Sequence, residues 1–172
     1  MEFLKLAEQR YSVRKFKPES IPQEQVGAIL QAGHLAPTGK NTQPQRILIL
    51  DNQESLEKLK DCTKCHFDAP LAMLVCADSE DCYIRPYDGK YGHEIDASIV
   101  TTYMMLKAQE MGIGSTWVMH FNPTKMRETF AVPEKYDIVA LLVMGYPAED
   151  ATPSPLHYQF DDEENVVFYN KF

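Results

Sequence analysis

The sequence predicts one three-layer domain in which helices cover a small β-sheet, of the α/β or α+β class. The chain has 172 residues, the length of one ordinary domain. Short apolar runs typical of buried strands alternate with segments whose apolar residues recur at helical spacing. No internal repeat or low-complexity segment interrupts this alternation, which excludes a solenoid or a largely disordered chain.

Helical spacing or helix-start signals occur in five segments, at residues 2–10, 23–35, 55–62, 93–111 and 122–132. Ser55 is one candidate N-cap of the third helix. The fourth helix is the longest, is apolar on much of its surface, and is stopped by Gly112 and Gly114. A helix that is apolar nearly all round is buried at the centre of a domain or at a subunit interface.

Four short apolar runs are expected to be strands, at residues 46–50, 71–77, 115–119 and 138–144. The segments 36–44 and 79–92 are polar and are expected to be loops. From Ala148 onward the chain is acidic and contains prolines, until an apolar patch at 166–169 that could add an edge strand. Such a tail cannot fold alone, so we expect it to lie across another surface.

The formal net charge of −8 argues against nucleic acids and anionic membranes as partners, because both attract basic surfaces. The N-terminus lacks the apolar run of a signal peptide, and no stretch approaches the ~20 apolar residues of a membrane-spanning helix. We therefore expect a cytoplasmic protein whose four cysteines are reduced thiols.

Residues 10–16 read Arg-Tyr-Ser-Val-Arg-Lys-Phe, where a helix gives way to an extended segment. Arg10 and Arg14 are four residues apart, with the hydroxyl of Ser12 between them. Guanidinium groups match phosphate oxygens in bidentate geometry, and a hydroxyl donates one more hydrogen bond. Taken alone, the segment is a phosphate-binding candidate or a solvated basic turn.

Residues 36–44 read Ala-Pro-Thr-Gly-Lys-Asn-Thr-Gln-Pro and concentrate hydroxyls, amides and turn-forming residues. Such a loop can present Asn and Gln side chains to the donor and acceptor edge of a heterocycle. Taken alone, it is equally an ordinary polar loop.

Together with Gly-Ile-Gly-Ser-Thr-Trp at 112–117 and Gly-Tyr-Pro at 145–147, these two segments resemble FMN-dependent nitroreductases. Their order and spacing match over roughly residues 3–169. The resemblance implies an α+β fold, a three-layer sandwich whose central, mostly antiparallel sheet is flanked by helices. It also implies one domain over residues 1–172 and an intertwined homodimer, in which the C-terminal arm, residues 148–172, wraps the partner subunit.

The resemblance further implies an FMN site built from both subunits. In one subunit, Arg10, Ser12 and Arg14 would hold the phosphate and ribityl chain. From the opposite subunit would come Pro37, Thr38 and Asn41, with Asn41 and Gln43 reaching the pyrimidine side of the flavin.

The last part of the expected site runs past the isoalloxazine ring and consists of Trp117, Val118, Met119 and His120. Backbone amides near Met119 and His120 would point at the N5/O4 edge, where a fixed donor stabilises negative charge on reduction. Trp117 is also expected to pack in the core.

The implied activity is a ping-pong reaction, in which NADH or NADPH reduces the flavin and a small electron-poor acceptor reoxidises it. Nitroaromatics and quinones are the acceptors that the resemblance implies. Because the flavin supplies the reactive atom, no side chain is expected to be catalytic. Two alternatives stay open: another flavin reaction on the same fold, such as dehalogenation or flavin fragmentation, or a flavin-binding or redox-sensing module without turnover.

One departure from the family pattern concerns the C-terminal tail. Members usually place a basic residue there that reaches the FMN phosphate, whereas this chain has Phe160 or its neighbours and no Arg or Lys over residues 156–162. His157 could substitute when protonated. Otherwise Arg10 and Arg14 hold the phosphate alone, or flavin affinity is lower than usual.

The segment Cys62-Thr63-Lys64-Cys65-His66 has the form of a c-type haem attachment pattern, which requires export and is rejected without an export signal. A zinc site formed with Cys76 and Cys82 is disfavoured, because Cys76 falls in an expected buried strand. We expect no metal site, and surface thiols at a helix end.

Two features of the segment before and within the longest helix have alternative interpretations. Asp96 lies three residues after His93 and could form an acid/base pair with it, but favourable placement near a helix N-terminus is the preferred explanation. Tyr83, Tyr87 and Tyr91 line the substrate opening or form a minor hydrophobic cluster.

Overall fold

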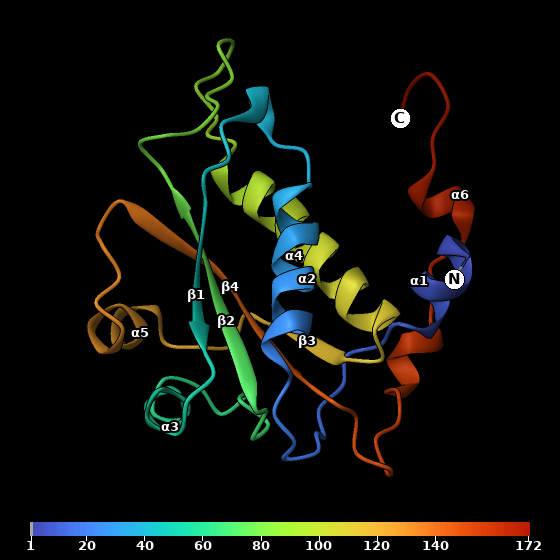
Figure 1. Ribbon diagram of the computed structural model, residues 1–172. Helices are drawn as coiled ribbons and strands as arrows, with labels where there is room; N and C mark the ends of the chain where they lie inside the picture. The colour runs from blue at the N-terminus through green and yellow to red at the C-terminus, as the bar shows by residue number, and fades with distance from the viewer. Residues whose placement is uncertain (1) are drawn as a thin grey trace.

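The computed structural model describes residues 2–172 and contains one four-stranded antiparallel sheet with the strand order β1-β2-β4-β3 (Figure 1). The strands are β1 (Gln45–Leu50), β2 (Leu71–Asp78), β3 (Gly114–Val118) and β4 (Tyr136–Gly145). All three strand pairs are antiparallel. The four expected strands are therefore confirmed, and the sheet belongs to the α+β class rather than the parallel α/β class.

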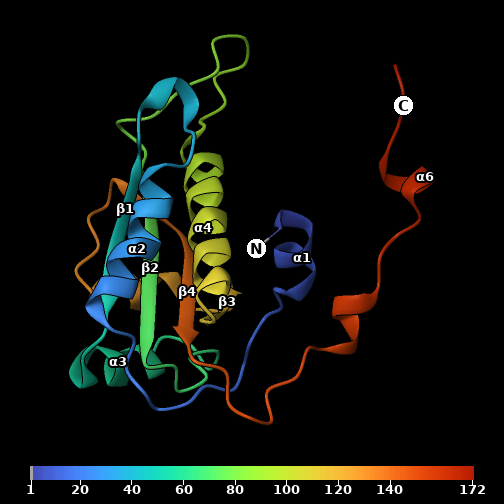
Figure 2. The ribbon, with the colours of Figure 1, turned by 45° about the vertical axis from the view of Figure 1, so that its right-hand side comes forward.

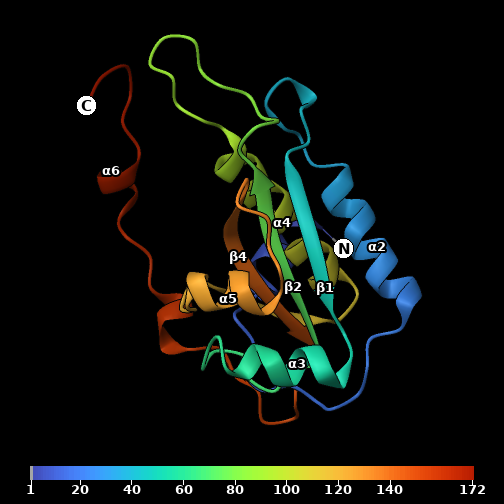
Figure 3. The same ribbon diagram turned by 90° about the vertical axis from the view of Figure 1, so that its left-hand side faces the viewer.

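Helices cover both faces of this sheet and make three layers (Figures 1 and 3). The helices α2 (Gln23–His34) and α4 (His93–Glu110) lie on one face, and α3 (Gln53–Lys60) and α5 (Pro123–Thr129) lie on the other. Outside these layers are α1 (Phe3–Gln9) and α6 (Glu163–Val166), with two 3-10 turns, η1 (Gly39–Asn41) and η2 (Pro155–Tyr158). Among residues 2–172, no helix has the length and hydropathy needed to cross a membrane.

The core has one layer on each side of the sheet, and β2 contributes to both. Met73 and Val75 pack under α2 and α4, whereas Leu74 and Cys76 pack under α3 and α5. All eight residues of β2 are buried. This two-sided burial explains why the strand appears in the sequence as an uninterrupted apolar run without alternation.

The start of α3 differs from the prediction. The helix begins at Gln53, because the Asn52 side chain accepts a 2.9 Å hydrogen bond from the Ser55 N–H group. Ser55, the candidate N-cap, is instead the third helical residue, and its hydroxyl donates to the Asn52 carbonyl. Both residues are suitable cap types, so residue type alone could not separate them.

The apolar patch at 166–169 is not an edge strand within this chain, so that prediction is wrong. Val166 ends the single turn of α6, and residues 167–169 form no strand. Figure 2 shows the arm leading away from the sheet, so its N–H and C=O groups meet no strand edge of the same chain. A strand needs such an edge to pair with.

The first part of the C-terminal arm follows the N-terminal segment of the same chain. The Ala148 N–H group donates to the Lys15 carbonyl at 3.0 Å, and Lys15 Nζ lies 2.5 Å from an Asp150 carboxylate oxygen. Farther along the arm, His157 Nε2 lies 3.1 Å from the Glu8 carbonyl oxygen. The arm after η2 carries exposed apolar side chains, which include Phe160, Phe168, Tyr169 and Phe172.

Candidate functional site

The candidate phosphate-binding segment lies beside the edge strand β3. Ser12 forms a parallel bridge to Ser115, and the Val13 N–H group donates to the Ser115 carbonyl at 3.1 Å. Val13 is fully buried. Because side chains alternate along an extended segment, Arg10, Ser12 and Arg14 share the side opposite Val13 and are half-buried or exposed.

This arrangement requires a glycine in β3. A Cβ atom at Gly114 would lie 2.6 Å from Val13 Cγ2 and 2.9 Å from Val13 Cβ. The Thr116 hydroxyl donates to the Val13 carbonyl and adds a second attachment. Glycine in the 112–117 motif therefore has a defined role, which is to let the segment that carries Arg10 and Arg14 approach the strand closely.

The continuation of β3 carries the residues expected beside the isoalloxazine ring. Trp117 is half-buried and packs against the core layer under α2 and α4, which confirms its structural role, whereas Val118 packs into the opposite layer. Met119 is 64% exposed and His120 is exposed. The N–H groups of Met119 and His120 find no hydrogen-bond acceptor within residues 2–172, so both amides can donate to a bound molecule.

The loop that contains Pro37, Thr38, Asn41 and Gln43 lies at the other end of the sheet. Figures 1 and 2 show η1 beyond the start of β1, far from the junction of the N-terminal segment and β3. Pro37 and Asn41 are exposed, and Thr38 and Gln43 are half-buried. A single chain thus joins the first and third predicted segments but keeps the loop apart from both.

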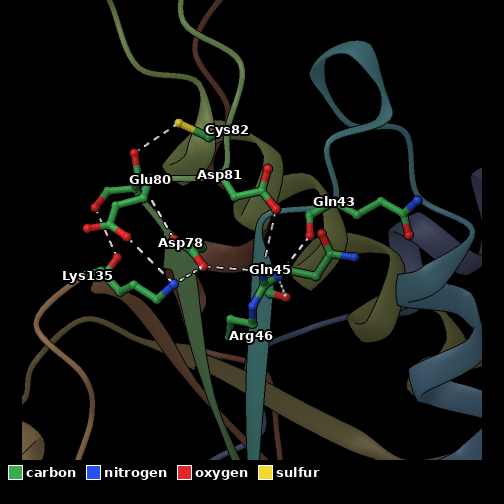
Figure 4. Close-up of polar contacts among 9 residues, drawn as sticks. Gln43, Gln45, Arg46, Asp78, Glu80, Asp81, Cys82 and Lys135 are labelled. Carbon is green, nitrogen blue, oxygen red and sulfur yellow. Dashed lines mark hydrogen bonds and ion pairs between the residues drawn. The ribbon is translucent and has the colours of Figure 1, made fainter.

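A charged network supports the base of this loop (Figure 4). Arg46 Nη1 donates to the Gln43 carbonyl at 3.0 Å, and Arg46 Nη2 lies 3.3 Å from the buried carboxylate of Asp78. Lys135 Nζ lies 3.3 Å from the same carboxylate oxygen. Burial raises the pKa of Asp78, but the Glu80 N–H group, Lys135 and Arg46 outweigh it and hold that pKa below its usual value.

The position expected for the tail cation is occupied by an exposed aromatic residue. Phe160 is 87% exposed. The nearby His157 instead lies beside Tyr11, and their ring centroids are 6.3 Å apart. Tyr11 follows Arg10 directly in the sequence. His157 is therefore one of the arm residues that the fold brings to the phosphate-binding segment of the same chain, together with Ala148, Asp150 and Ala151.

Two of the larger open grooves contain at most one of these residues. One cavity of about 730 Å³ is lined by residues 60–64 and 120–123, and it includes only His120 of the predicted set. It lies between the end of α3 and the start of α5. Because the loop around η1 lies at the other end of the sheet from the N-terminal segment, the predicted residues do not all meet at one place in a single chain over residues 2–172.

The contacts of Asp96 differ from those expected from the sequence. Its side chain is buried, and Oδ1 accepts a 3.0 Å hydrogen bond from the Gly39 N–H group. His93 does not pair with it, because His93 Nε2 lies 2.8 Å from Asp137 Oδ2. Favourable placement near a helix N-terminus is thus an incomplete explanation, and no local sequence signal indicated the contact with Gly39.

The prediction of surface thiols at a helix end is only partly correct. Cys62 is buried, and its thiol lies 3.5 Å from the Thr129 hydroxyl and 3.6 Å from the Lys58 carbonyl. Cys65 is half-buried. Burial raises the pKa of the Cys76 thiol to about 11, so Cys76 is a core residue rather than a ligand or nucleophile.

The chain resembles known proteins in both sequence and structure. The model of the nitroreductase family matches residues 7–83 and 66–146. A nitroreductase family protein from Clostridium difficile 630 has a solved structure that is 38% identical, with a TM-score of 0.93 over 100% of both chains. The structure of an FMN-dependent nitroreductase from Clostridium difficile R20291 is 28% identical, with a TM-score of 0.80 over 99% of this chain and 100% of that one.

The chain is also 26% identical to a curated NADH dehydrogenase of Thermus thermophilus, over 84% of this chain and 86% of that protein. The match of the family model spans well over half of the chain and includes the N-terminal arginine segment, the loop around η1 and β3. The observed three-layer fold agrees with that of the solved relatives. The chain belongs to the nitroreductase family.

Proposed function

We propose that this chain is an FMN-dependent NAD(P)H oxidoreductase that works as a homodimer. The observation that carries the proposal is the parallel contact of Ser12 with Ser115, in a chain that belongs to this family. That contact joins the cationic side chains of Arg10 and Arg14 to the strand that ends in the free amides of Met119 and His120.

The donor set fits FMN at both ends of the cofactor. Two guanidinium groups and a hydroxyl suit a phosphate, because they donate several charge-assisted hydrogen bonds. The two free backbone amides suit the edge of a heterocycle that gains negative charge on reduction. The chemistry supplied by bound FMN is hydride acceptance from NADH or NADPH and electron release to a small electron-poor acceptor, such as a nitroaromatic or a quinone.

The chain's own residues would bind and orient the cofactor, and none needs to act as a nucleophile or as an obligate base. Arg10, Ser12 and Arg14 hold the phosphate end. The partner's copy of the loop around η1 would bring Asn41 and Gln43 to the pyrimidine side, since within one chain this loop lies at the other end of the sheet from β3 (Figure 1). Met119 and His120 provide fixed donors whose orientation costs nothing at the moment of reaction.

Exposed apolar surface supports the dimer. The α4 helix buries one face against α2 and the sheet, yet Ile95 is 51% and Tyr103 is 42% exposed on the same helix. The arm after η2 exposes Phe160, Phe168 and further apolar residues. Because proteins rarely leave large apolar patches uncovered, we propose that residues 148–172 continue from their own N-terminal segment onto the partner subunit. We also propose a cytoplasmic location, in which the four free cysteines would stay reduced.

The direct experiment uses the purified protein. We expect a yellow protein whose flavin absorbance is bleached anaerobically by NADH or NADPH and restored by a nitroaromatic or quinone. A colourless protein that cannot be reconstituted with FMN would overturn the proposal. Separate titrations with NADH and NADPH, followed by a panel of acceptors including halogenated phenols, would identify the donor and expose dehalogenation if that is the reaction.

The phosphate contact is tested by Arg14→Ala. Loss of one charge-assisted contact should cost about 1.5–3 kcal/mol, or roughly a 10- to 150-fold rise in the FMN dissociation constant. Lys17→Ala is the matched control, since it removes an exposed positive charge three residues away. Unchanged FMN affinity of the Arg14 variant by equilibrium dialysis would rule out its assigned role.

A second candidate, a flavin-binding module without turnover, is favoured by the tail. No Arg or Lys occurs over residues 156–162, and Phe160 is exposed. Bound flavin that neither pyridine nucleotide reduces would favour this candidate over the enzyme.

A further inference from the structure

The loop around η1 has a backbone that its own sequence does not favour. Lys40, Asn41 and Gln43 have φ values of 51°, 57° and 50°. Positive φ is uncommon for residues with a Cβ atom, and three such residues within four positions persist only when surrounding groups hold them. Asn41 and Gln43 are also the residues proposed to contact the flavin, so whatever holds this backbone sets the geometry of that contact.

Asp96 restrains this loop from a distant part of the chain. It lies in the first turn of α4, is only 5% exposed, and its Oδ1 accepts from the Gly39 N–H group across 57 residues of sequence. Its Oδ2 is buried and has no hydrogen-bond partner within residues 2–172. A carboxylate that served only the helix N-terminus would not need to be buried, and Glu94 on the same turn is exposed.

Other contacts restrain the same loop, but they act at a different end of it from Asp96. The Thr38 hydroxyl accepts from the Gln43 N–H group at 3.1 Å, and Arg46 donates to the Gln43 carbonyl (Figure 4). Those contacts fix the end of the loop that enters β1. Asp96 holds Gly39 at the beginning, where Tyr83 packs so closely that a Cβ atom at Gly39 would lie 2.8 Å from Tyr83 Cβ.

Buried polar atoms without a partner occur in this loop, in the strand that it enters and in Asp96. Within residues 2–172 they are Thr42 Oγ1, Gln45 Oε1 and Asp96 Oδ2. The first two belong to the loop and the strand that it enters, and the third belongs to the residue that holds the loop. Such atoms are costly to bury, so a fold keeps them where they serve a specific arrangement.

We propose that Asp96 is a positioning residue of the flavin site. Its carboxylate holds Gly39, and through Gly39 the left-handed backbone that presents Asn41 and Gln43 to the flavin of the opposite subunit. Asp96 itself does not contact the flavin. This inference rests on the proposed function only for its effect on FMN; the restraint on the loop is a property of the protein without cofactor.

The test compares Asp96→Ala, Asp96→Asn and Glu94→Ala in the full-length protein. Alanine removes the acceptor, asparagine keeps a carbonyl oxygen at the same place, and Glu94→Ala removes an exposed acid from the same helical turn. We expect Asp96→Ala to raise the FMN dissociation constant roughly 10-fold or more, Asp96→Asn to recover most of the affinity, and Glu94→Ala to leave it unchanged. Hydrogen exchange in the cofactor-free protein should accelerate over residues 39–43 in Asp96→Ala alone.

The outcomes separate this inference from the proposed function. If the wild-type protein binds no FMN, the proposed function fails, while exchange over residues 39–43 still tests the restraint. If Asp96→Ala folds and retains both FMN affinity and slow exchange, the positioning role is wrong and the proposed function stands. An equal loss in Glu94→Ala would assign the effect to the helix N-terminus and overturn the inference. If Asp96→Ala does not fold, exchange at the wild-type Gly39 amide decides: protection supports the hydrogen bond, and exchange at the rate of an unstructured peptide refutes it.

Discussion

The contact between Val13 and Gly114 makes a sharp prediction about stability. In Gly114→Ala, the new methyl group would lie 2.6 Å from Val13 Cγ2, 2.9 Å from Cβ and 3.1 Å from Cγ1. Val13 is fully buried and branched at Cβ, so it cannot swing away as the end of a long side chain can. The N-terminal segment must therefore move away from β3.

The magnitude follows from two opposing terms. Overpacking of this kind costs about 1–3 kcal/mol. Replacing glycine by alanine within a strand regains about 0.5–1 kcal/mol, because the unfolded chain loses backbone freedom. The net loss of about 0–2.5 kcal/mol corresponds to a fall in Tm of at most about 10 °C for a chain of this size.

Thermal and urea unfolding of the cofactor-free protein, followed by far-ultraviolet circular dichroism, measure this change. Gly27→Ala in α2 is the matched control, since a Cβ atom there meets nothing within 4 Å and should stabilise the helix by about 0.5–1 kcal/mol. Val13→Ala combined with Gly114→Ala should cost less than the sum of the single changes, because the two residues share one contact. If Gly114→Ala is stabilised as much as Gly27→Ala, the close approach does not exist.

The same displacement has a functional consequence. Because Arg10, Ser12 and Arg14 belong to the segment that Gly114→Ala pushes away, the FMN dissociation constant should rise in this variant and remain unchanged in Gly27→Ala. Equal FMN affinity in the two variants, with the stability loss confirmed, would separate the phosphate site from the segment beside β3.

Three further predictions concern charge, capping and thiol chemistry. Asp78→Asn should cost about 1–3 kcal/mol at pH 7 by urea unfolding. The pKa of Asp78 is lower in the folded protein than in the unfolded chain. Its stabilisation is therefore present above the ordinary Asp pKa of about 4 and is lost as the pH falls through the folded pKa, so the stabilities of the two proteins should converge in acid. A stability difference that does not change with pH would contradict this. Asn52→Ala should cost about 1 kcal/mol and exceed the cost of Ser55→Ala, and the reverse order would mean that Ser55 is the cap. Burial raises the pKa of Cys76 to about 11, so Cys76 should resist a thiol reagent at pH 8 until urea unfolds the protein. Mass mapping of labelled peptides would measure this, and rapid labelling of the native protein would place Cys76 outside the core.

Strands and helices were predictable because their signals are local. The run over 71–77 is apolar at every position, and a segment buried on both faces has no other composition available. The helix over 93–110 was expected to end before Gly112, which has a φ of 75° and follows the last helical residues directly. Errors arose where two suitable residues competed for one role, as Asn52 and Ser55 did for the N-cap.

The arm illustrates the limit of composition. Its apolar patch at 166–169 has strand-forming residues, but a strand also needs an edge to pair with, and none of the same chain lies beside it. Strand propensity describes these residues correctly, but it does not show whether a strand edge lies beside them to pair with.

The sequence by itself determined the four strands, the five longer helices, the burial of the strand over 71–77 and, through its motifs, the family and the candidate cofactor residues. Only the tertiary structure decided which of those residues meet. The bridge from Ser12 to Ser115 spans about a hundred residues, and the hydrogen bond from Gly39 to Asp96 spans 57. The reason is physical: periodicity reports which side of a segment is buried, whereas a contact between distant segments depends on how the layers pack around the whole sheet. Asp96 was therefore visible in the sequence as an acid at the start of a helix, and only packing showed that it holds the loop of Asn41 and Gln43.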